Sequence, residues 1–104
     1  MYVEFTQERI AKLRIQKDTS AREMSLALGQ NESYINQIEN KKALPSLPGL
    51  FYICEYLGVT PQEFFDEGNA YPQRLRQLVA EAQKLDDRAL GRVLEIVKEI
   101  NGEK

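Results

Sequence analysis

The stretch "SAREMSLALGQNESYINQIENKK", residues 20–42, carries the signals of two short helices joined by a tight turn. Ser20 and Glu23 form a capping box, in which each side chain satisfies a backbone N–H of the other, so a helix is expected to begin at Ser20. Gly29 is expected to end that helix, because glycine adopts the left-handed conformation at no steric cost. Asn31 is a typical N-cap residue and predicts a second helix directly after it.

Each of these helices has one narrow apolar side. Met24 and Leu28 lie four residues apart in the first helix, and Ile35 and Ile38 lie three apart in the second. A connecting turn of only about three residues forces the two helices to cross steeply, which is the helix-turn-helix arrangement.

The second helix also carries a polar side that helix propensity does not explain. Its amides and small hydroxyl groups are poor helix formers away from the caps. These side chains belong to Asn31, Ser33, Asn36, Gln37 and Asn40. We therefore expect this side to have a role outside the fold, although a solvated surface is the simplest alternative.

Further helices are expected on both sides of this stretch. The spacing of Phe5, Ile10 and Leu13 predicts a helix over residues 5–16 that stops at Lys17 and Asp18, where aspartate tolerates a left-handed turn. Two more helices are expected downstream. They span residues 47–56, with Ser46 as cap and Gly58 as stop, and a short segment from Thr60, whose capping box uses Glu63, to Phe65.

The last third of the chain predicts two amphipathic helices after a linker at residues 66–71. Their apolar stripes have the same spacing and fit a two-helix hairpin whose surplus apolar face meets the main domain or a second subunit. Dimerisation through these stripes is the prediction for Leu75, Leu78, Val79, Leu90, Val93, Leu94, Val97 and Ile100. The sequence thus predicts an all-α chain with a domain at residues 1–66 and a hairpin at residues 67–104.

Composition excludes several function classes. The 104 residues contain no histidine and one cysteine, Cys54, which removes Ser-His and Cys-His catalysis, a disulfide framework and the usual zinc sites. Cys54 continues the apolar face of its helix and is expected in the core. We predict no enzymatic activity, no cofactor and no metal. The chain also lacks a membrane-spanning run and a signal peptide, so a cytoplasmic location is expected.

Net charge gives no general signature of nucleic-acid binding. The chain carries a formal charge of −2, and residues 1–65 hold seven basic side chains against eight carboxylates. Any positive potential towards DNA phosphates would have to be local.

Residues 9–65 resemble the Cro and lambda-repressor type of helix-turn-helix domain, the XRE-like family of bacterial and phage regulators. The residues that match the spacing of the family are Ser20, Ser25, Leu28, Gly29, Ile35, Ile38, Glu39, Pro45, Ser46, Leu47, Leu57, Gly58, Val59 and Phe65. The resemblance implies a five-helix DNA-binding domain in which Arg14 pairs with Glu39. It also implies that Ser25 is small because the third helix crosses over it.

The resemblance further implies that the third helix enters the major groove of double-stranded DNA. Its base-reading residues would then be Glu32, Ser33, Tyr34, Asn36 and Gln37, since amides can read adenine and a carboxylate can accept from cytosine. Contacts to phosphate would come from Ser20, Asn31, Asn40, Lys41 and Lys42. For Tyr34, a DNA contact and a plain surface position both remain open.

These observations predict a sequence-specific DNA-binding transcriptional regulator, a repressor that binds a palindromic operator as a homodimer. The alternative is a protein-interaction module, antitoxin-like or an anti-regulator, that keeps the fold with weak or no DNA binding. Two departures from the family favour the alternative. Many members carry glutamine where this chain has Ala21, and Glu32 would bring negative charge towards phosphates.

Overall fold

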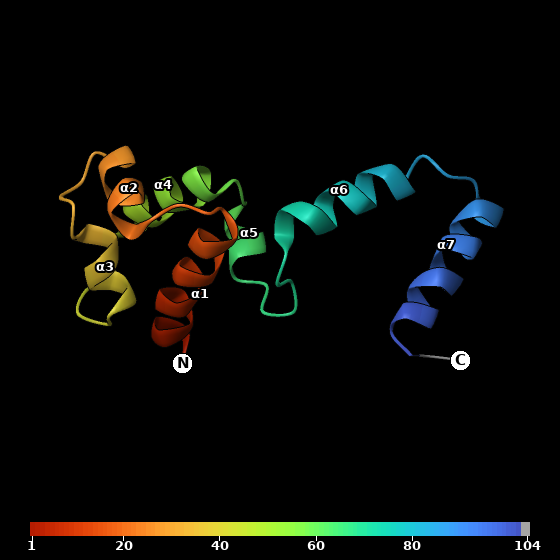
Figure 1. The fold of residues 1–104 in the computed structure, drawn as a ribbon, viewed down its shortest axis with the longest axis horizontal. Coiled ribbons are helices and arrows are strands. Elements are labelled where there is room, and N and C mark those ends of the chain that lie inside the picture. The colour runs from red at the N-terminus through yellow and green to blue at the C-terminus, as the bar shows by residue number, and fades with distance from the viewer. Residues whose placement is uncertain (103–104) are drawn as a thin grey trace. The chain divides into compact units, whose positions relative to one another are not determined.

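The computed structural model describes residues 1–102, and within them it contains seven α-helices and no strands (Figure 1). The helices are α1 (Tyr2–Gln16), α2 (Ala21–Ala27), α3 (Tyr34–Glu39), α4 (Leu47–Leu57), α5 (Pro61–Phe64), α6 (Pro72–Ala82) and α7 (Asp87–Ile100). The chain divides into two compact units, Met1–Ala70 and a second that begins at Tyr71, which is four residues after the boundary expected at residue 66. The all-α prediction is confirmed.

The first unit holds the hydrophobic core. Side chains from α1 to α5 and from the turn before α5 meet in one cluster of buried residues. The cluster comprises Ile10, Leu13, Met24, Ile35, Ile38, Leu50, Ile53, Cys54, Leu57, Val59 and Phe64. Burying one large aliphatic or aromatic side chain contributes about 1.5–3 kcal/mol, so this cluster is the main source of stability in the first unit.

Most of the expected helix ends are confirmed. Ser20 Oγ accepts a hydrogen bond from Glu23 N at 3.0 Å, and Glu23 Oε1 accepts one from Ser20 N at 3.4 Å. The second capping box, at Thr60 and Glu63, forms in the same way. Gly29 and Gly58 have φ values of +73° and +72°, and Asp18 also lies in the left-handed region at +58°. The helix that precedes Asp18 begins at Tyr2, three residues before the expected start.

The start of α3 differs from the prediction. The helix begins at Tyr34, with Ser33 at the N-cap position, and Asn31 does not cap it. Instead, Asn31 Oδ1 accepts hydrogen bonds from Ser33 N at 2.9 Å and from Ser33 Oγ at 2.7 Å. An asparagine that bonds the backbone two residues ahead closes an Asx-turn, and this turn satisfies the same kind of donor that a cap would. The prediction that Asn31 begins the helix is therefore wrong.

The second unit consists of α6 and α7, and its apolar stripes stay largely exposed. Asp86 caps α7 by accepting a hydrogen bond from Ala89 N at 2.8 Å, as expected. On both helices most stripe residues are exposed, namely Leu75, Leu78, Val79, Leu90, Leu94, Val97 and Ile100, and Val93 is half-buried. The two helices are present where expected, but they do not bury their stripes against each other. Among residues 1–102, no helix is both long enough and apolar enough to cross a membrane.

Cys54 provides the first testable prediction. It is buried in the core, and burial raises the pKa of its thiol from 9.0 to about 11. The unfolded chain therefore loses this proton first, so the thiol's contribution to stability is full below about pH 9 and declines as the pH rises towards 11. Urea unfolding at pH 8 and pH 10 measures this decline. In Cys54→Ala the free energy of unfolding should fall less between these two pH values. An equal fall in both chains would contradict a raised pKa for the buried thiol.

Candidate nucleic-acid interface

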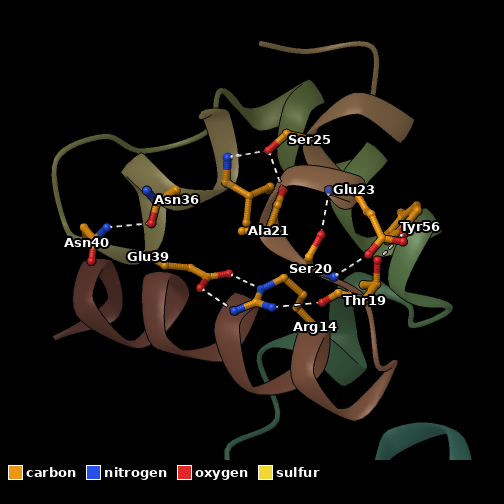
Figure 2. Close-up of polar contacts among 11 residues, drawn as sticks. Arg14, Thr19, Ser20, Ala21, Glu23, Ser25, Asn36, Glu39, Asn40 and Tyr56 are labelled. Atoms are coloured by element: carbon orange, nitrogen blue, oxygen red, sulfur yellow. Dashed lines mark hydrogen bonds and ion pairs between the residues drawn. The ribbon is translucent and has the colours of Figure 1, made fainter. Parts of the chain in front are cut away.

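A bidentate ion pair holds the end of α3 against α1. Arg14 Nε and Nη2 donate to the two carboxylate oxygens of Glu39 at 2.7 and 2.9 Å, while Nη1 donates to the carbonyl of Thr19 at 2.9 Å (Figure 2). The side chains of Arg14 and Glu39 are only 17% and 13% exposed, and the pairing raises the pKa of Arg14. The predicted pair is confirmed. It fixes α3 to α1 and to the residue that precedes the cap of α2.

Ser25 ties the other end of α3 to α2. Its side chain is fully buried, and its Oγ donates to the carbonyl of Ala21 at 2.7 Å and accepts from Ile35 N at 2.9 Å (Figure 2). The predicted close crossing of the two helices at Ser25 is thus present. The bond to Ile35 was not anticipated: it satisfies one of the N–H groups in the first turn of α3, which no intrahelical carbonyl can reach.

Replacing Ser25 tests this role. Ser25→Ala should destabilise the first unit by about 1–3 kcal/mol, because the buried Ile35 N–H loses its acceptor. Ser25→Val should cost more, since added methyl groups at a fully buried crossing separate the helices. Ser33→Ala is the matched control, because the Ser33 hydroxyl bonds only side chains at the surface. Urea unfolding measures all three variants. A Ser25→Ala chain as stable as Ser33→Ala would contradict this role.

The outward side of the turn and of α3 carries two chains of hydrogen-bonded polar groups. In the first, Ser33 Oγ donates to Asn31 Oδ1 and lies 3.3 Å from Gln37 Nε2, which donates to it. In the second, Asn40 Nδ2 donates to Asn36 Oδ1 at 2.7 Å (Figure 2). Four of these five side chains are exposed, and Ser33 is half-buried. The polar residues predicted from the sequence are therefore exposed or half-buried, and each makes a side-chain hydrogen bond to another member of the set.

Tyr34 occupies a different place from the other predicted base-reading residues. It is half-buried, packs against the core, and has a pKa raised by burial. Its hydroxyl lies at the start of α4, where a Cβ added to Gly49 would come within 3.0 Å of the Tyr34 Oη. A side chain at position 49 would therefore crowd the Tyr34 hydroxyl, which lies against the first turn of α4.

Several charges on this surface are already paired. Arg22 Nε donates to Glu32 Oε2 at 3.1 Å, in a pair whose side chains are 69% and 60% exposed. Lys41 Nζ lies 3.0 Å from Glu8 Oε1. Lys42 is exposed and forms no ion pair with any residue in the described part of the chain, residues 1–102. Arg22 was not singled out from the sequence, although it offsets the negative charge of Glu32 that counted against DNA binding.

The predicted phosphate-contact residues are all exposed, but the side chains of four of them already have partners: Asn40 donates to Asn36, Lys41 pairs with Glu8, and Ser20 and Asn31 bond nearby backbone. Ser20 Oγ caps α2, and the Asn31 side chain closes the turn. Lys41 adopts a left-handed φ of +64° at the end of α3, and Lys42 N then donates back to the carbonyl of Gln37 at 2.9 Å. This arrangement turns the chain sharply directly after α3, where Asn40, Lys41 and Lys42 are all exposed.

Comparison with known proteins supports one assignment. No curated protein and no solved structure matches the chain. The model of a helix-turn-helix family matches residues 10–64, just over half of the sequence, and this range includes α2, the turn and α3. The matched range, the Arg14–Glu39 pair and the close crossing at Ser25 agree. The chain therefore belongs to the lambda-repressor type of helix-turn-helix family, a family of DNA-binding regulators.

Proposed function

We propose that this protein is a sequence-specific transcriptional repressor that binds a palindromic operator as a homodimer. In this proposal α3 of each subunit enters the major groove, and the two half-sites lie about one helical turn, roughly 34 Å, apart on one side of the duplex. The main support for this proposal is that both ends of α3 are fixed, by the Arg14–Glu39 pair and by Ser25, while its outward side carries hydrogen-bonded amides. Binding groups that are fixed in advance lose less conformational entropy when they meet their target.

Gln37 is the strongest candidate for reading a base. Its amide uses one N–H to reach Ser33 Oγ, which leaves the second N–H and the carbonyl oxygen for a partner. Reading adenine in the major groove requires one donor and one acceptor on the same side chain. Asn36 points outward on the same helix and carries the same pair of groups. Glu32 and Ser33 stand at the turn before α3, and Glu32 can accept from cytosine if it leaves Arg22.

Electrostatics favours a modest affinity for each subunit. Glu32 and Glu8 each engage a basic residue, and Lys42 is the basic side chain most available to phosphate among the residues proposed for that role. Few phosphate contacts mean little counterion release. A second subunit then supplies the rest of the affinity, because two linked half-site contacts act at a high effective concentration.

The dimer itself is proposed to form through the apolar stripes of α6 and α7. Two helices that leave this many leucines, valines and isoleucines exposed do not make a stable unit alone. Covering the stripes with those of a second copy removes the apolar surface from water. It also generates the twofold symmetry that a palindromic operator requires.

Two substitutions separate sequence reading from phosphate binding. On an operator selected from fragmented DNA, Gln37→Ala should lower the preference over random DNA by about 5- to 150-fold, as expected for one lost bidentate base contact. Lys42→Ala should weaken both kinds of DNA alike and reduce the salt dependence by about one charge. Lys84→Ala, which removes a charge outside the first unit, is the control. If Gln37→Ala keeps the full preference, α3 does not read the operator in this way.

A second candidate function is a protein-interaction module, antitoxin-like or an anti-regulator. The exposed stripes of α6 and α7 favour it, since they offer an apolar surface to a different protein as readily as to a second copy. The double variant Gln37→Ala with Lys42→Ala discriminates in cells. Loss of regulation in the double variant supports DNA binding. Regulation that survives in it, yet disappears without residues 72–104, supports the interaction module.

A further inference from the structure

Arg9 of α1 is a buried arginine that binds backbone carbonyls. Only 5% of its surface is exposed. Its Nε donates to the carbonyl of Phe64 at 2.8 Å, and its Nη2 donates to the carbonyls of Glu63 at 2.8 Å, Asp66 at 3.3 Å and Asn69 at 2.6 Å. These carbonyls belong to the end of α5 and to the segment that follows it. A guanidinium is buried at low cost only when its donors find such acceptors.

A second side chain of α1, Gln16, also binds the segment that follows α5. Gln16 Nε2 donates to the carbonyl of Ala70 at 2.7 Å, and the Gln16 side chain is exposed. Arg9 and Gln16 are seven residues apart, so they lie on the same side of α1, about 10 Å from each other along its axis. Together they bind carbonyls along residues 63–70, which we call the exit segment because the second unit begins directly after it.

Helix α1 thus holds two parts of the first unit that matter for binding DNA. Through Arg14 it binds Glu39 at the end of α3, and through Arg9 and Gln16 it binds the exit segment. The position from which the chain leaves the first unit is therefore fixed relative to α3. Tyr71 is the first residue after the exit segment, and Pro72 already begins α6 with a restricted φ.

We propose that Arg9 and Gln16 are positioning residues that set the half-site spacing the protein accepts in its operator. This inference rests on the proposed function as a dimeric DNA-binding protein. If the exit segment were released, residues 66–70 could extend and lengthen the connection in each subunit by at most about 17 Å. Half a turn of DNA is also about 17 Å, so the released chain can reach half-sites that the held chain cannot.

The test measures DNA affinity as a function of spacing. Full-length chains are titrated onto operators in which 0–6 base pairs are inserted between the two half-sites, and onto a single half-site. In the wild type, five inserted base pairs should lower the affinity at least about tenfold, because the second subunit then faces the opposite side of the duplex. In the double variant Arg9→Gln with Gln16→Ala, which frees the whole exit segment, this loss should shrink at least about threefold, with the single half-site affinity unchanged. Each single variant should shrink the loss in the same direction by less, because the other side chain still holds part of the segment.

The control is Gln62→Ala, which removes an exposed amide of α5 and should leave the spacing profile as in the wild type. Gln16→Ala decides the question if Arg9→Gln does not fold, because Gln16 is exposed and contributes one bond. The inference is overturned if Gln16→Ala keeps the wild-type spacing profile, or if the wild type itself accepts all spacings. A wild type that binds no fragment better than random DNA would instead remove the proposed function.

Discussion

Deleting residues 72–104 is expected to lower affinity for a two-half-site operator by about 10²- to 10⁴-fold, the range gained when two linked sites bind together. The first unit should survive the deletion, because its core and the contacts of Arg9 and Gln16 all lie within Met1–Ala70. Affinity for a single half-site should stay within a few-fold of that of the full chain. Light scattering should give one chain's mass for the truncated protein and twice one chain's mass for the full one.

A point variant tests the same claim without removing the second unit. Leu94→Gln places an amide in the exposed apolar stripe of α7 and should weaken the dimer and the operator affinity together. Arg92→Gln is the matched control, since residues 92 and 94 face nearly opposite sides of an α-helix. If the full chain is a monomer, or if Leu94→Gln and Arg92→Gln have equal effects, dimerisation through the stripes is wrong.

The second large effect is expected from Glu39→Ala. This variant leaves the Arg14 guanidinium, whose side chain is only 17% exposed, without its carboxylate partner. Breaking a mostly buried ion pair on one side should destabilise the first unit by roughly 2–4 kcal/mol. In a domain of this size each kcal/mol lowers the thermal midpoint by about 4–8 °C. Operator affinity should fall as well, because the end of α3 is no longer fixed to α1.

Glu32→Ala is the matched control for this prediction. It also removes one carboxylate from an arginine pair near α3, but Arg22 and Glu32 are 69% and 60% exposed. Exposed ion pairs contribute about 0–1 kcal/mol, so the loss of stability should be small. Thermal unfolding of both variants gives the comparison, and Arg14→Met with Glu39→Ala completes a double-mutant cycle. Equal losses in Glu39→Ala and Glu32→Ala would contradict the structural role of the Arg14–Glu39 pair.

Local signals allowed most of the helices to be predicted from the sequence. The capping boxes at Ser20 and Thr60 and the glycine stops at Gly29 and Gly58 each act within a few residues, so the sequence alone contains all the interacting groups. The start of α3 was misplaced for a related reason. Asn31 can cap a helix or close a turn with similar bonds, and only the geometry beyond it selects the turn.

Contacts between residues that are distant in the sequence could not be predicted from local patterns. The Arg14–Glu39 pair was expected only through the resemblance to a family. Arg9 was counted merely as one of the basic residues, because nothing near it in the sequence reveals carbonyl partners 54–60 residues away. Residues 66–70 therefore looked like a linker by composition, whereas two side chains of α1 hold them in the first unit.

The candidate site shows the same division between local and distant contacts. The amide-rich surface could be predicted, because Asn36, Gln37 and Asn40 recur at helical spacing. The half-buried position of Tyr34 could not, because it results from contacts with the core and with the start of α4, which is distant in the sequence. The partner of Glu32 was also hidden, since Arg22 lies on the other helix of the motif.

Selection of bound fragments from a random genomic library by the full chain, followed by titration with salt, measures directly whether the protein reads an operator. We expect enriched fragments that share an inverted repeat with half-site centres about one helical turn apart. Their affinity should fall steeply as the salt concentration rises. Fragments bound no better than random DNA, or an affinity that does not respond to salt, would contradict the claim that α3 and its polar surface read an operator.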